Sequence, residues 1–128
     1  MTLREALAES INTAFVDAVS RIDNGPKQVM KAAEQAGVTK GPGWDNNNRI
    51  ALGTAEVSPL DNASGYATLA NGGKAVAEHV VNTVKDMNGK TLYTAKETSK
   101  QTIESDVADN VTSALRSVVT QGTGTSVN

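Results

Sequence analysis

Apolar positions in residues 3–22 recur at steps of three and four, and this spacing predicts an amphipathic helical segment. Thr2 is a suitable N-cap, because Glu5 three residues later completes a capping box. The middle of the segment carries polar side chains that compete for backbone hydrogen bonds. We therefore predict two helices separated by a turn at residues 10–12.

Two further helices are predicted from proline at their first turn and glycine after their last. Pro26 suits the start of a helix over residues 27–36, which Gly37 would end. Pro59 follows a capping serine and starts another helix, which the glycine pair at 72–73 would close in left-handed conformation.

The segment between these helices predicts a loop, because residues 38–48 are rich in Gly, Pro and Asn. Its single tryptophan, Trp44, is the expected packing anchor of that loop. Residues 50–53 predict a short extended stretch. Residues 1–73 are therefore predicted to form a helix-rich part of the chain.

The pattern changes in the second half. Residues 79–94 hold two runs of β-branched residues on either side of an Asp-Met-Asn-Gly turn, which predicts a β-hairpin. Residues 95–102 predict a polar connection, and Asp106 is the expected cap of a C-terminal helix over residues 105–121. The whole order predicts an α+β fold that is mainly α with a small β-hairpin.

Composition narrows the classes of function. The 128-residue chain has a net charge of −2 and a pI near 5.3, which favours neither nucleic acid nor an anionic membrane as a partner. It has no cysteine, and residues 45–48 lack the alternating acidic ligands of a calcium loop. We expect no metal and no cofactor. We also expect a soluble chain, because no apolar run approaches the roughly 20 residues that span a bilayer.

Ser10-Ile11-Asn12 is the candidate site, because Ser-x-Asn is one of three motifs of a serine acyl-transfer site. The other two, Ser-x-x-Lys and Lys-Thr-Gly, are absent from the sequence. Ser10 has no lysine or histidine at helical reach to activate it, and His79 has no suggestive Ser-His-Asp spacing. Taken alone, the triplet is better explained as a polar kink in an amphipathic helix.

Residues 50–73, the turn at 86–90 and the closing helix into Gln121-Gly122-Thr123-Gly124 resemble the transpeptidase domain of class A penicillin-binding proteins. The resemblance covers essentially the whole chain in the order of that family. It implies the helical subdomain portion of a fold whose site lies between helices and a sheet. It also implies that Ser10 relays a proton between two lysines absent here, and that Asn12 hydrogen-bonds the amide of an acyl donor.

The resemblance further implies a parent protein that cross-links peptidoglycan stem peptides, is acylated by β-lactams, and lies outside the cytoplasm at the bacterial plasma membrane. The expected partner is the remainder of the transpeptidase domain, with the missing strands and the nucleophile helix. Whether the chain is an enzyme stays open, and alone we expect it to be inactive. The alternative is a non-catalytic binding or assembly module, such as half of a split protein or a self-associating helical scaffold.

Overall fold

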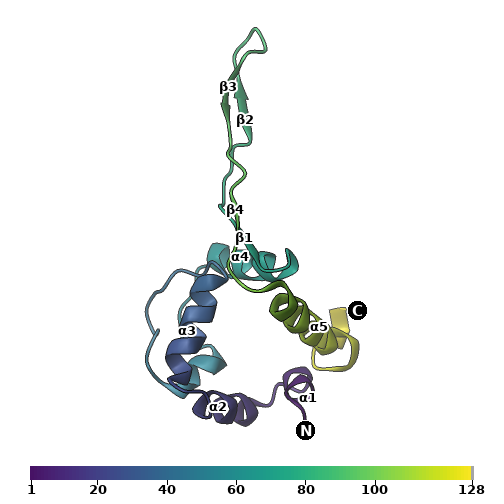
Figure 1. Cartoon of the computed structure of the whole chain (residues 1–128). Helices are drawn as coiled ribbons and strands as arrows, with labels where there is room; N and C mark the ends of the chain where they lie inside the picture. The colour runs from purple at the N-terminus through teal and green to yellow at the C-terminus, as the bar shows by residue number, and fades with distance from the viewer. Residues whose placement is uncertain (128) are drawn as a thin grey trace.

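A computed structural model describes residues 1–127, which form helices and two small sheets (Figure 1). The helices are α1 Leu3–Ala8, α2 Asn12–Ser20, α3 Gly25–Gln35, α4 Pro59–Ala70 and α5 Ser105–Gln121, with 3-10 helices η1 Asn48–Leu52 and η2 Thr125–Val127. The strands are β1 Lys74–Val76, β2 Thr83–Lys85, β3 Thr91–Thr94 and β4 Ser99–Gln101. The predicted α+β class is confirmed.

The helices follow one another around a ring, and the strands leave this ring as a long ribbon (Figure 1). Helix α1 packs against α2 and α5, while α5 packs on α4. The 3-10 helix η1 packs against both α2 and α3. The ribbon starts directly after α4, whose last turns pack against β1.

The ribbon has two separate antiparallel pairings. At its tip β2 pairs with β3, with Thr83 opposite Thr94, and the register shifts between Val84 and Lys85. The hairpin therefore has a shorter first strand than the one predicted from residue 79. His79 instead bonds locally, with its Nε2 2.8 Å from Asn82 Oδ1.

The prediction of a mere polar connection over residues 95–102 is wrong. Strand β4 lies in that segment and pairs with β1 at the base of the ribbon, with Lys74 opposite Gln101. Backbone groups make this pairing, and every residue of β4 is exposed. The alternation of apolar and polar side chains that marks a half-buried strand is therefore missing.

Two further local predictions are corrected. The extended stretch at 50–53 is the 3-10 helix η1, because Asn47 Oδ1 accepts a 2.9 Å bond from the Arg49 amide and Gly53 ends the turn at φ 82°. Helix α5 begins one residue before Asp106, with Glu104 as its N-cap. The Asp106 carboxylate instead accepts the amide of Val107 within the first turn.

Small side chains form the most buried contacts between helices. Ala6, Ala8 and Ala108 are almost inaccessible to solvent, and they lie on α1 and α5. Because these residues lack long side chains, the two helices approach closely. Among residues 1–127, no helix combines the length and the apolar character needed to cross a membrane.

Candidate functional site

Helix α1 ends in a Schellman motif that places Ser10 in left-handed backbone conformation. The Ile11 amide donates to Ala6 O at 2.9 Å, and the Ser10 amide donates to Leu7 O at 3.2 Å. This pair of bonds defines the motif and puts Ser10 at the position after the C-cap, with φ 56°. A serine in this region costs about 1 kcal/mol, because its Cβ crowds the backbone. The predicted turn between two helices is confirmed.

Two other helices end with the same motif, and both have glycine at this position. After α3, Val38 donates to Ala33 O at 3.0 Å around Gly37, whose φ is 96°. After α4, Gly73 donates to Thr68 O at 2.9 Å around Gly72, whose φ is 62°. Ser10 therefore occupies the position that glycine occupies in the two other Schellman motifs, and Asn24, at φ 52°, is the other described non-glycine residue in left-handed conformation.

Ser10 and Asn12 line one pocket of about 320 Å³ beside the turn. Helix α2 begins at Asn12, so the turn presents both side chains to the same space. The remaining lining residues are all apolar, and they come from α1, α2 and η1: Leu7, Phe15, Ala51 and Leu52. The structure therefore brings the two predicted site residues together.

The side chains of Ser10 and Asn12 are both exposed. In residues 1–127, no side-chain hydrogen bond involves Ser10 Oγ or the carboxamide of Asn12. No basic side chain lines their pocket. Ser10 therefore has no neighbour here that would activate it as a nucleophile, whereas a hydroxyl and an amide can relay a proton and orient a substrate amide.

The α1 helix that carries this turn is fixed at both ends. At its start, the Thr2 amide donates to Glu5 Oε2 at 2.7 Å and the Glu5 amide donates to Thr2 Oγ1, so the predicted capping box is confirmed. The bonds from Thr2 hold the pKa of Glu5 below its ordinary value of 4.5. At its end, the Thr123 amide donates to Ala8 O at 3.0 Å.

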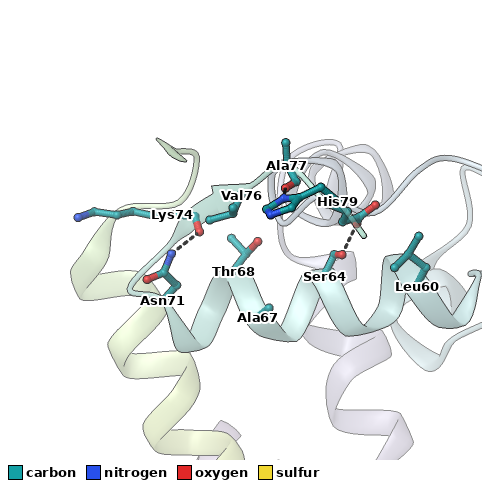
Figure 2. A pocket seen from close by; sticks show the side chains of 10 residues that line it. Leu60, Ser64, Ala67, Thr68, Asn71, Lys74, Val76, Ala77 and His79 are labelled. Carbon is teal, nitrogen blue, oxygen red and sulfur yellow. Dashed lines mark hydrogen bonds between the residues drawn. The ribbon is translucent and has the colours of Figure 1, made fainter. Parts of the chain in front are cut away.

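A larger hollow of about 530 Å³ lies between α4 and the start of the ribbon (Figure 2). Ser64 donates a hydrogen bond to Glu78 at its rim, and the Asn71 carboxamide donates to Lys74 O at 3.1 Å. Its serine is therefore already paired within the chain. Neither Ser10 nor Asn12 lines this hollow, so it is separate from the predicted site.

Sequence reasoning missed the wall of the Ser10 pocket. Ala51 and Leu52 reach it from η1, a segment read from sequence as an extended stretch. The predicted loop anchor is confirmed, because Trp44 is buried and its Nε1 donates to Glu56 O at 3.2 Å. In the sequence, the single tryptophan of this loop was the signal that the loop is anchored to the rest of the chain.

Comparison with known proteins defines the class. The family model described as the penicillin binding protein transpeptidase domain matches residues 1–128. The chain therefore belongs to this transpeptidase family. Its resemblance to class A penicillin-binding proteins is likewise confirmed by the relatives described next.

The chain is similar to particular members of this family. It is 35% identical to penicillin-binding protein 1A of Mycolicibacterium smegmatis and 37% identical to that of Mycobacterium tuberculosis, over 91% of this chain in both cases. It spans 17% and 16% of the length of those relatives, respectively. The solved structure of the Mycobacterium tuberculosis penicillin-binding protein PonA1 superposes with a TM-score of 0.82 at 34% identity, over 92% of this chain and 34% of that one. The chain thus corresponds to part of a penicillin-binding transpeptidase domain.

Proposed function

We propose that this chain contributes the middle motif of the acyl-transfer site of a bacterial peptidoglycan D,D-transpeptidase. The observation that carries the proposal is Ser10, held in left-handed conformation where α3 and α4 are followed by glycine. Backbone strain of this kind gathers at functional sites, where a side chain is needed in a fixed position. The hydroxyl it fixes makes no side-chain hydrogen bond within residues 1–127 and shares a pocket with Asn12.

In this proposal Ser10 relays a proton and does not attack the substrate. A hydroxyl can accept a proton from one group and donate its own to another, which suits a relay between two lysines supplied by the remainder of the domain. Asn12 orients the acyl donor by hydrogen-bonding its side-chain amide. The donor is a peptidoglycan stem peptide or, in inhibition, a β-lactam.

The nucleophile comes from outside this chain, because the sequence contains no Ser-x-x-Lys. The chain alone is therefore predicted to be inactive. Its partner is the remainder of the transpeptidase domain, and the parent protein acts outside the cytoplasm at the plasma membrane. The inferred partner and location rest on the family to which the chain belongs. The inferred role of Ser10 rests in addition on its left-handed backbone conformation.

The test is intact-mass measurement after exposure to a penicillin, with the chain alone and with the flanking segments of a matching transpeptidase. We expect no adduct on the chain and an adduct on the serine of the added segment. Ser10→Ala and Asn12→Ala should each slow that acylation by about 100-fold. Ser64→Ala is the matched control, because Ser64 already bonds to Glu78. An adduct on Ser10 itself would overturn the proposal.

A second candidate function, a non-catalytic assembly module, is favoured by the ribbon. Apolar side chains of the ribbon are exposed, among them Val84, Leu92 and Tyr93. A two-stranded ribbon is marginally stable alone and gains by pairing or packing with another chain. Light scattering after size exclusion tests this candidate: a dimer supports it, and a monomer over the full concentration range contradicts it.

A further inference from the structure

Arg4 extends from α1 to α5, where its Nη1 donates a 2.8 Å hydrogen bond to Ser113 O. The partner is a neutral carbonyl, so this bond orients the guanidinium and leaves its charge unbalanced. Among residues 1–127 the one ion pair joins Arg21 to Asp17, and Arg4 takes no part in it. A guanidinium has several N–H donors besides the one used here. Arg4 is therefore an oriented cation with donors still available.

A second arginine lies over the same stretch of α5. Arg116 stands three residues after Ser113, and a long side chain on a helix leans back over the preceding turn. Both arginines line a hollow of about 440 Å³ beside α5. Arg116 also has no ion pair within the described part of the chain. An anion in this hollow would be attracted by both guanidinium groups.

Hydroxyl groups of α5 complete the polar lining of the hollow. Ser117 and Thr120 donate to carbonyl groups of their own helix at 2.6 and 3.2 Å, so their hydrogens are already used. Thr112 and Ser113 line the same hollow, and in residues 1–127 neither hydroxyl takes part in a side-chain hydrogen bond. These two hydroxyls can donate to the same anion as the arginines.

Asp109 limits the charge of the ligand, because it is the one acidic residue that lines the hollow. It stands four residues before Ser113, whereas Arg116 stands on the C-terminal side of Ser113. Two arginines and one aspartate leave a single net positive charge. A ligand with one negative charge balances it, whereas a phosphate dianion would add excess negative charge beside Asp109.

We propose that this hollow is a carboxylate-binding site in which Arg4 and Arg116 hold the carboxylate of a small acid or of a peptide terminus. The planar guanidinium matches the two oxygens of a carboxylate, which gives the site its selectivity. The hollow shares no residue with the pocket of Ser10 and Asn12. The inference is therefore independent of the proposed function, and either can fail without the other.

The test is a titration of the full chain with acetate at constant ionic strength, followed by NMR of the arginine Nε–H signals. We expect the signals of Arg4 and Arg116 to shift together and to saturate with one dissociation constant. Arg49 is the matched control in the same sample, because it lies outside the hollow and has no ion pair in residues 1–127. Its apparent affinity should be at least about tenfold weaker. Signals of Arg4 and Arg116 that respond no more than that of Arg49 would overturn the proposal.

Two variants at exposed positions of α5 test the shared site and its charge. Arg116→Gln should weaken acetate binding at Arg4 about tenfold, because a charged donor is lost. Asp109→Asn should strengthen it about threefold, because the opposing charge is removed. A dissociation constant at Arg4 that is unchanged in Arg116→Gln would overturn the proposal, and one unchanged in Asp109→Asn would contradict the charge assigned to the ligand.

Acetyl-glycyl-glycine in place of acetate distinguishes the two sources of the carboxylate. Tighter binding of this peptide than of acetate assigns the site to a peptide terminus, and equal binding assigns it to a small acid. The C-terminal amide of the same peptide lacks the carboxylate and should shift neither Arg4 nor Arg116. An equal shift by the amide would overturn the proposal. Inorganic phosphate should bind more weakly than acetate, because Asp109 repels its second charge.

Discussion

The ends of α1 and α4 share one backbone design and differ in a single side chain. Each closes with the pair of bonds of a Schellman motif around a left-handed residue, which is Ser10 after α1 and Gly72 after α4. Glycine is the residue that this conformation favours, and serine adds strain. Because glycine satisfies the same backbone conformation after α4, we propose that the serine is present for what its hydroxyl does.

Both turns are held by hydrogen bonds from distant parts of the chain. The end of α4 is tied by the Ile103 amide, which donates to Gly73 O at 3.1 Å. The end of α1 is tied by the Thr123 amide, which donates to Ala8 O at 3.0 Å. The turn after α4 also receives the Thr102 amide at Gly73 O and the Gln101 side-chain amide at Gly72 O. It is therefore held by more bonds than the turn after α1, which presents Ser10 beside Asn12.

The largest effect on stability is expected where the chain is tied to α1. In Gly122→Ala the new Cβ would overlap the Ala8 carbonyl oxygen, so either α1 or the end of α5 must move. We expect the free energy of unfolding in urea to fall by about 2 kcal/mol. Gly124→Ala is the milder comparison, because the nearest atom to its Cβ, Val118 O, lies 3.2 Å away. Equal losses in the two variants would contradict this account of how α1 is held.

The next largest effect is expected when each of the two left-handed residues, Ser10 and Gly72, is replaced by the residue type of the other. Gly72→Ser should lower the free energy of unfolding by about 1 kcal/mol, since a Cβ there meets open space and only the backbone conformation resists it. Ser10→Gly should raise stability by about 0.5 kcal/mol, because relief of strain exceeds the added freedom of the unfolded chain. Urea unfolding of both variants checks this pair, and a Ser10→Gly chain that is clearly less stable would break the comparison.

The smallest effect concerns the capping box at the other end of α1. The folded state holds the pKa of Glu5 below its ordinary value of 4.5, so the carboxylate contributes stability above that value. The contribution is lost as pH falls through the lowered pKa. Glu5→Ala should therefore be less stable than the unmodified chain at pH 6, and the two should converge towards pH 3. A difference that stays constant over this range would show that ionisation of Glu5 is not involved.

Local signals in the sequence predicted the helix ends well. Thr2 with Glu5, and Ser58 before Pro59, act through hydrogen bonds within four residues, so the residues that decide the structure stand next to one another. The turn at Ser10 was likewise predicted from polar residues inside an apolar pattern. Its left-handed conformation was not, because serine gives no sign of it.

Contacts between distant parts of the chain were not predictable in this way. Strand β4 is polar throughout and is defined by its pairing with β1, for which the side chains give no pattern. The apolar wall of the site depends on Leu52 reaching the pocket of Asn12 from a separate loop. The Ser-x-Asn motif was identified from the sequence, whereas the apolar residues that surround it were identified only from the structure.

The central claim is that Ser10 is retained for its hydroxyl, and acylation of the assembled domain by a penicillin tests this most directly with Ser10→Gly. Glycine keeps the turn and removes only the side chain, so a loss of rate cannot be ascribed to a damaged fold. The account predicts a chain at least as stable as the unmodified one and acylation slower by about 100-fold. An acylation rate equal to that of the unmodified chain would contradict it.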